Sequence, residues 1–368
     1  MIWILLLVQN VLATFFGRFE RLSGFLTFIG LGFIAGLADP RHNADYSLYK
    51  NSYDLGWQNF EHGYTWIATR SMQYGISYST FRFWLLLSIF VLLAFSLSLI
   101  TRRLAAVAFF YGVSAFALDS IQVRNVAATA FIVLAIAVLV RFPNFKGVVL
   151  SFVCLWLGAE FHTIAYIFLV VPIFAIWKFD FSKYFNFFVI VVYTISLLMF
   201  SNLKLYFSIF IAKILETVSS RSNLGSNILE VYSQGTVFRY WVMLATVALM
   251  LFWLFSYGFR TVSISEDEYE YNSSVSVVIL IGVVSVFLMT ISVDYVRVLR
   301  IVSLFFFVFV MDLFDKFLQE KHVGQAWLIY LYTFVYSILF LYVQLRYVYV
   351  VQDSFGYIVG LIDPNILR

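Results

Sequence analysis

The amino-acid sequence predicts an all-α polytopic integral membrane protein, and two observations carry this prediction. Of the 368 residues, 62% are hydrophobic and only 12% are charged, which is about half the charged fraction of an ordinary soluble domain. Apolar runs recur along the whole chain, each near the length of about 20 residues that a helix needs to cross a bilayer. The composition therefore excludes a soluble enzyme.

The apolar runs predict helices because they are continuous and do not alternate with polar residues, as membrane strands would. In hydrocarbon each backbone donor and acceptor needs an internal partner, which a helix supplies. We expect about 12 transmembrane helices. They lie near residues 2–16, 22–38, 83–101, 104–119, 125–140, 147–160, 162–177, 184–200, 237–257, 275–293, 300–315 and 325–344.

The first run, Ile2 to Phe16, has no basic residue before it and is followed by Arg18 and Arg21. A secretory signal has the opposite charge order and ends in a small-residue cleavage site. We interpret this run as a retained helix whose N-terminus lies outside the cytoplasm. The single cysteine, Cys154, lies inside an apolar run and is expected to be a small core residue.

Basic residues in the short loops orient the helices, because such residues concentrate on the cytoplasmic side. They fall between alternate pairs of expected helices, so one side can hold them all: Arg18, Arg21, Arg102, Arg103, Arg141, Lys146, Lys178, Lys183, Arg260, Lys316 and Lys321. Two long loops, 39–82 and 201–239, then lie on the outer side, and residues 60–80 predict an interfacial or re-entrant helix. No internal repeat is visible, so residues 1–368 are expected to form a single membrane domain.

Ionisable residues that interrupt or border the spans indicate where function lies, because each costs about 2.5–3.5 kcal/mol inside a bilayer on insertion scales. In the expected topology they all fall at outer helix ends or in the first outer loop, although they are far apart in the sequence. They are Asp39, Arg41, Asp45, Glu61, Asp119, Arg124, Glu160, His162, Asp294, Arg297 and Arg300. We therefore expect them to share one site at the outer face.

The arginines of this set suit an anionic group. Arg124 lies in a short polar turn with Gln122, where it faces a cavity or an anion, or extends from a helix end to the interface. Asp294, Arg297 and Arg300 are three residues apart and form one stripe on a helix, so Asp294 can pair with Arg297 and leave Arg300 a free cation. Two guanidiniums on one face suit a diphosphate, and the alternative is an ion pair that anchors the helix.

Two further groups combine acids with histidine or aromatic rings. His162 and Glu160 interrupt an apolar stretch, and we interpret His162 as a general base or as a capping or core histidine. Acids beside aromatic rings in the first outer loop are typical of carbohydrate binding, the alternative being an ordinary solvated loop. Those loop residues are Arg41, Asp45, Tyr49, Glu61 and Tyr64.

Several common site patterns are missing from the sequence. It has no Asp-x-Asp pair, no P-loop, no zinc-type Cys/His spacing and no nucleophile elbow. The net charge of +4 is spread along the chain and gives no nucleic-acid footprint. We therefore expect no metal, no cofactor and no nucleic-acid partner, and we expect arginine to supply the cations for an anionic substrate.

Four segments occur in order along the first half of the chain: 41–49, 61–64, 121–127 and 161–165. Together they resemble the EpsG/Wzy group of bacterial polysaccharide polymerases. Ile121-Gln-Val-Arg124-Asn-Val-Ala127 is similar to that group's Ile-Arg-Gln-x-x-Ala segment, and Phe161-His162-Thr163-Ile-Ala165 to its Phe-His-x-Ser-Ala segment. The departures are His62 after Glu61, where proline is frequent, a reversed Gln–Arg order interrupted by valine, and Thr-Ile in place of serine after His162.

This resemblance implies a multi-pass protein of the bacterial inner membrane, active at the periplasmic or outer face. Its substrate would be an undecaprenyl-diphosphate-linked oligosaccharide, joined into O-antigen, capsule or exopolysaccharide. Its partners would be the lipid bilayer and, in the same pathway, a chain-length regulator and a flippase.

The expected mechanism assigns the site residues to three tasks. Arg124, Arg297 and Arg300, with Gln122 and Asp294 beside them, would hold the donor diphosphate. His162, aided by Glu160, would take the proton from the acceptor hydroxyl. Asp45, Glu61 and the loop aromatics would position the acceptor sugar.

Other membrane functions fit the composition as well. A lipid-linked oligosaccharide flippase or another transporter suits about twelve spans, but transporters usually show related halves and midplane charges. A glycosyltransferase such as an O-antigen ligase would share the mechanism and differ in its acceptor. The one-sided gathering of ionisable groups favours surface chemistry over transport.

Overall fold

The computed structural model describes residues 2–38, 40, 43–177, 181–200, 206, 209–210, 213, 236–261 and 269–348. Within these residues every regular element is a helix, so the all-α prediction is confirmed for them. Arg41, a predicted substrate-binding residue, lies outside the described residues, as does most of the predicted outer loop 201–239.

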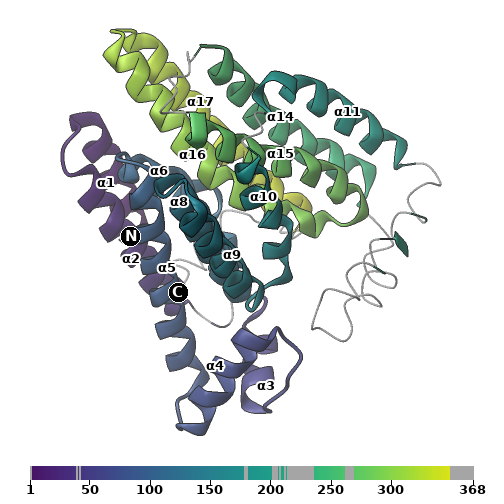
Figure 1. The fold of residues 1–368 in the computed structure, drawn as a ribbon. Helices are drawn as coiled ribbons and strands as arrows, with labels where there is room; N and C mark the ends of the chain where they lie inside the picture. The colour runs from purple at the N-terminus through teal and green to yellow at the C-terminus, as the bar shows by residue number, and fades with distance from the viewer. Residues whose placement is uncertain are drawn as a thin grey trace.

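The first part of the chain forms a group of long helices with a small lobe at one end (Figure 1). Its elements are α1 (Ile2–Phe16), α2 (Glu20–Gly36), α3 (Tyr46–Asp54), α4 (His62–Gln73), α5 (Tyr78–Ile100), α6 (Leu104–Ser114), α7 (Phe116–Asp119), α8 (Val123–Arg141) and α9 (Phe145–Ala159). Helix α5 packs on α2 and α8, and α8 packs on α9. Helices α3 and α4 make up the lobe.

The second part of the chain packs beside the first (Figure 1). Its elements are η2 (Thr163–Leu169), α10 (Val170–Ile176), η3 (Ser182–Tyr184), α11 (Phe185–Leu198), α14 (Phe238–Thr261), α15 (Tyr269–Ile291), η6 (Val293–Tyr295), α16 (Val296–Gln319), α17 (Val323–Val343) and the π-helical η7 (Gln344–Val348). Helix α16 contacts α15, α17, α14, α6 and α8, so it joins the two parts.

All twelve predicted runs contain helices, and among the described residues five helices are long and apolar enough to cross a membrane by length and composition. The five lie in α5, α8, α14, α15 and α17. Shorter apolar helices are α1, α6, α9, the η2–α10 segment and α11. The structure thus supports a membrane protein, while the number of crossings stays a prediction.

Three predicted segments differ in detail from the structure. The run 104–119 is broken at Ala115, where the backbone leaves the helical region at φ −121°. The run 162–177 is a 3-10 turn followed by a short α-helix. The first long loop does not extend to residue 82, because Ser77 caps α5 by accepting a hydrogen bond from the Thr80 N–H, and it contains the unpredicted helix α3 as well as α4.

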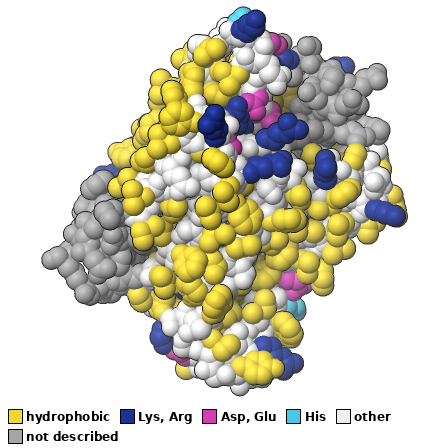
Figure 2. Space-filling model, turned by 90° about the vertical axis from the view of Figure 1, so that its left-hand side faces the viewer, with side chains coloured by type: hydrophobic (Ala, Val, Ile, Leu, Met, Phe, Trp, Pro, Cys, Tyr) yellow, Lys and Arg dark blue, Asp and Glu magenta, His cyan; other side chains and the backbone are white. Residues whose placement is uncertain are grey.

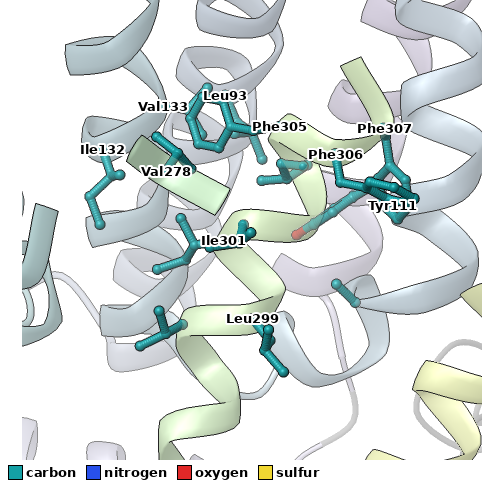
Figure 3. Close-up of a cluster of buried hydrophobic side chains, with 14 of the residues drawn as sticks. Leu93, Tyr111, Ile132, Val133, Val278, Leu299, Ile301, Phe305, Phe306 and Phe307 are labelled. Carbon is teal, nitrogen blue, oxygen red and sulfur yellow. The ribbon is translucent and has the colours of Figure 1, made fainter. Parts of the chain in front are cut away.

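The hydrophobic core surrounds α16. Leu299, Ile301 and the run Phe305 to Phe307 on this helix are almost completely buried. Figure 3 shows them among side chains of α5, α6, α8 and α15, including Leu93, Val133 and Val278. A helix buried on all sides supports its neighbours, so the residues at its ends are held in fixed positions.

Polar clusters mark the two ends of the helices around this core. At one end Arg103, after α5, pairs with Glu20 at the start of α2 and with Asp315 near the end of α16. At the other end Arg82, in the first turns of α5, donates to the carbonyl of Ala35 near the end of α2. These ends are roughly 22–24 Å apart along α2 and α16, and hydrophobic side chains fill much of the surface between them on the α1–α2 side (Figure 2).

Candidate functional site

The turn between α7 and α8 forms the floor of the candidate site. Arg82 is only 1% exposed and holds this turn by donating to the Ser120 carbonyl at 2.8 Å. The same guanidinium donates to the carbonyls of Ala35 and Gly36 at 2.6 and 3.1 Å. Arg82 thereby satisfies carbonyls at the end of α2 and ties them to the turn.

Arg300 of α16 reaches this turn from the opposite part of the chain. Its Nη1 lies 3.2 Å from Asp119 Oδ1, and its Nη2 donates to the Gln122 side-chain oxygen. Tyr111 of α6 donates to the other carboxylate oxygen of Asp119 at 3.0 Å. The prediction that Arg300 is a free cation is therefore wrong, because α16 is buried and its residue 300 faces the turn instead of water.

Arg124, in the first turn of α8, lies among groups from the lobe. It pairs with Glu61, which is 2% exposed, and its Nε donates to the Tyr49 hydroxyl at 3.2 Å. The guanidinium carbon lies 4.1 Å from the ring centre of Phe60, within range of a cation–π contact. Tyr64 packs against Tyr49 with ring centres 5.7 Å apart, so the aromatic residues surround the arginine.

Arg297 and Asp294 form the most accessible pair of the site. They are 3.0 Å apart, with the side chains 24% and 35% exposed, so the predicted pairing is present. Asp45, at the start of α3, completes the cluster. Burial raises the pKa of Asp45, while the nearby charges of Arg297, Arg124 and, less strongly, Arg300 oppose this shift. Arginines of α8 and α16 thus act electrostatically on the Asp45 carboxyl group.

The Glu160–His162 turn packs against the lobe beside this cluster. The Tyr64 N–H donates to the Glu160 carbonyl at 3.2 Å, and Gly63 allows the close approach, since a Cβ there would lie 2.7 Å from the Glu160 Cβ. Tyr166 lies near both Glu160 and Glu61, whose charges act on it. The turn is therefore a direct neighbour of the Arg124–Glu61 pair.

His162 caps the 3-10 helix η2. Its Nδ1 accepts a hydrogen bond from the Ile164 N–H at 3.1 Å. A neutral imidazole that accepts at Nδ1 carries its proton on Nε2, so the ring presents a donor at its other nitrogen. The capping alternative is present in the structure, and the role of His162 in catalysis stays a prediction.

Sequence reasoning missed the residues that hold this arrangement. Asp119 was predicted to be part of the shared site, but no task was assigned to it. Residue 82 was predicted to be the last residue of the first long loop. The Ser77-x-x-Thr80 cap was a usable signal, because it starts the helix before Arg82 and moves that arginine into an apolar face. Nothing in the sequence indicates that Tyr111 donates to Asp119, since this contact depends on how α6 is rotated about its axis.

The assembled site combines arginines, which can bind an anion, with carboxylates. Arg124, Arg297 and Arg300 each have a carboxylate beside them, which fixes the orientation of each guanidinium and leaves further N–H donors for an oxyanion. For Arg300, neither Nε nor Nη1 has a hydrogen-bond partner among the described residues. In that same part of the chain, no three His, Cys, Asp or Glu side chains are placed to hold a metal ion.

Comparison with known proteins identifies the chain at the level of its family. No curated protein and no solved structure matches it. The EpsG family model matches residues 21–357, which include the lobe, the α7–α8 turn, the Glu160–His162 turn and α16. The chain therefore belongs to the EpsG family.

Proposed function

We propose that this protein is a membrane glycosyltransferase-type polymerase that joins undecaprenyl-diphosphate-linked oligosaccharide units into O-antigen, capsule or exopolysaccharide. Membership of the EpsG family supports a polysaccharide polymerase-like role. The observation that carries the finer proposal is a cluster of three ion-paired arginines, Arg124, Arg297 and Arg300, at one end of an apolar helix bundle. Such a site can hold a diphosphate at the membrane boundary while its lipid tail stays between helices.

The donor diphosphate binds to Arg297 and Arg124. Arg297 is the most exposed of the three arginines and makes the first contact, with Asp294 keeping its fork oriented. Arg300 is held by Asp119 and Gln122. It therefore does not contact the diphosphate and stabilises it only through the electrostatic effect of its charge. Charge that develops on the leaving diphosphate is stabilised by these fixed cations.

Glycosyl transfer then proceeds as a displacement at the anomeric carbon of the donor. The acceptor hydroxyl oxygen forms the new bond to this carbon, the bond from carbon to the diphosphate oxygen breaks, and the diphosphate leaves with the electron pair. Asp45 takes the hydroxyl proton, since its raised pKa makes it a better base than an ordinary aspartate. His162 donates from Nε2 to an oxygen of the bound sugars, and Glu160 keeps its turn against the lobe.

The lobe aligns the acceptor chain. Tyr49, Glu61 and Tyr64 are buried, so they act by holding Arg124 in place, while Trp57 and Trp66, 46% and 64% exposed, offer faces on which sugars stack. We place this lobe on the periplasmic or outer side of a bacterial inner membrane. A flippase and a chain-length regulator of the same pathway would supply the donor and limit the product.

A direct test uses purified full-length protein in detergent with lipid-linked repeat units. Wild-type protein should lengthen the units into a ladder, also in EDTA, because arginines supply the cations. Arg124→Lys keeps the charge but loses the planar fork, and it should slow the ladder by about 10²-fold or more. The matched control is Arg103→Lys, a second partly buried, ion-paired arginine at the far end of the bundle, which should keep wild-type activity.

Two results would refute the proposal. Wild-type protein that moves lipid-linked units between compartments without lengthening them would indicate a flippase. If the Arg124→Lys variant makes the same ladder as the wild-type protein, Arg124 does not bind the donor.

A further inference from the structure

An open groove runs between α1 and α2 at the end of the bundle away from the candidate site. It has a volume of about 810 Å³, and each helix lines it with residues three and four positions apart, including Leu12 and Phe16 of α1 and Leu22 and Leu26 of α2. These four side chains are between 47% and 66% exposed. The groove is therefore a largely apolar hollow on the surface of the molecule.

Basic side chains surround the mouth of this groove. Arg18 lines it directly, and a second hollow of about 590 Å³, which shares Phe19 and Leu22 with the first, is lined by Arg21 and Arg102. All three arginines are exposed. The group of Lys and Arg side chains in the upper part of Figure 2 lies on this side of the molecule.

The acid that lines the second hollow is already ion-paired. Glu20 is buried and pairs with Arg103, which also binds Asp315, with its Nε 2.8 Å from that carboxylate. Arg18, Arg21 and Arg102 thus face outward with their charge uncompensated by these carboxylates. A largely apolar groove with one arginine in its lining and two more in the adjoining hollow is complementary to a molecule with an alkyl chain and an anionic head.

We propose that this groove binds an anionic phospholipid, with one acyl chain along α1 and α2 and the phosphate against Arg18, Arg21 and Arg102. Guanidinium groups bind phosphate through paired donors, and basic pockets between membrane helices bind anionic lipid headgroups. The donor lipid is not the occupant, because the groove lies at the Glu20 end of α2 while Asp45 and its arginines lie near the Gly36 end. The site is thus separate from the proposed polymerase centre.

The test measures lipid retained on the purified full-length protein by native mass spectrometry. Phosphatidylglycerol is compared with phosphatidylcholine of the same acyl chains, and no glycan substrate is present, so the result is independent of polymerase activity. Wild-type protein should retain phosphatidylglycerol in preference. A basic side chain near an anionic lipid contributes about a fivefold gain in binding, so the triple variant Arg18→Gln, Arg21→Gln, Arg102→Gln should bind it about a hundredfold more weakly.

Two matched variants separate a built site from general charge attraction. The control Arg141→Gln, Lys146→Gln, Lys183→Gln removes three exposed basic groups from other helix ends and should retain the lipid as the wild type does. Ala13→Phe places an aromatic ring in the groove where the acyl chain would lie, with every arginine left in place, and it should also weaken retention of the lipid. The proposal is overturned if wild-type protein does not discriminate between the two lipids, if the control triple variant loses as much as the groove variant, or if Ala13→Phe binds normally.

Discussion

The charged residues of the site differ in how strongly their stability depends on an ion-pair partner. Arg300 and Asp119 are each 2% exposed, and a charge buried this deeply is tolerated only with its partner. Arg297 and Asp294 face the surface, so their pairing contributes little to stability. Loss of one partner therefore destabilises the protein at the buried pair, whereas the exposed pair is accessible to a substrate.

Asp119→Asn should destabilise the protein by about 3–5 kcal/mol, because it leaves the Arg300 charge uncompensated in the interior. Thermal unfolding in detergent measures the loss. The double variant Asp119→Leu, Arg300→Met should unfold near the wild-type temperature, since a buried ion pair can be replaced by apolar side chains. We expect it to remain inactive, and a fully active double variant would exclude Arg300 from donor binding.

Asp45 should give the polymerase an acidic limb in its pH profile. Burial raises the pKa of Asp45 above the 3.8 of an ordinary aspartate, so the folded state takes up this proton before the unfolded chain does as pH falls. The ionised carboxylate thus costs stability above the raised pKa, and this cost is absent below the unfolded value. Wild-type activity should fall with a midpoint above 3.8 as the base is protonated.

Asp45→Asn separates these two effects. It should abolish polymerisation at every pH, while its unfolding temperature near neutral pH equals or exceeds that of the wild type. Activity and unfolding temperature are measured on the same preparation from pH 4 to 8. An Asp45→Asn protein that keeps wild-type activity and its acidic limb would show that another group is the base.

At the scale of elements, the site depends on one close packing between the lobe and the bundle. Gly63, in the first turn of α4, touches the Glu160 backbone so closely that an added Cβ would lie 2.9 Å from its carbonyl oxygen. Gly63→Ala should push α4 away from the Glu160–His162 turn, destabilise the protein by about 1–3 kcal/mol and lower polymerisation.

Gly324→Ala is the matched control for this substitution. Gly324 lies in the first turn of α17, and an added Cβ there would meet nothing within 4 Å. The change should leave activity intact and raise the unfolding temperature slightly, because alanine is the better helix former. Equal behaviour of the two variants would mean that the contact with Glu160 is not needed.

The helices could be predicted from the sequence, but their interruptions could not. Continuous apolar runs indicate helices because the bilayer allows few alternatives. The break at Ala115 has no local signal, since alanine is the best helix former, and it arises where the chain turns toward Asp119. The spacing of Arg297 and Arg300 was correctly taken as helical, yet spacing does not tell which neighbour a residue faces, so the burial of Arg300 against the α7–α8 turn could not be foreseen.

At the scale of the whole molecule, two polar ends enclose an apolar middle. Helix α8 runs from Arg124 at the site to Arg141 at the other end, and the lobe lies beyond the site end. If the bundle spans the membrane as proposed, Trp57 in the lobe and Phe142 after α8, which are 46% and 51% exposed, lie on opposite sides.

Cysteine labelling tests this arrangement, since Cys154 is the single cysteine and Cys154→Ser provides a clean background. Trp57→Cys should react in intact cells with a membrane-impermeant maleimide. Phe142→Cys should react only after permeabilisation. Labelling of both from one side would contradict the spanning arrangement, and the reverse pattern would place the site on the cytoplasmic face.

The position of α16 also has a consequence for how the protein is made. This helix of 24 residues carries Arg297, Arg300, Asp312, Asp315 and Lys316, and it is not among the helices apolar enough to cross a membrane unaided. A nascent chain ending after α16 can therefore hold it in lipid only if α6, α8 and α15 have already gathered to shield its charges. In a translocon insertion assay, α16 alone should fail to integrate into the membrane, and it should integrate when the preceding segments are present. The helix at the centre of the mature bundle is therefore among the last to insert during biogenesis.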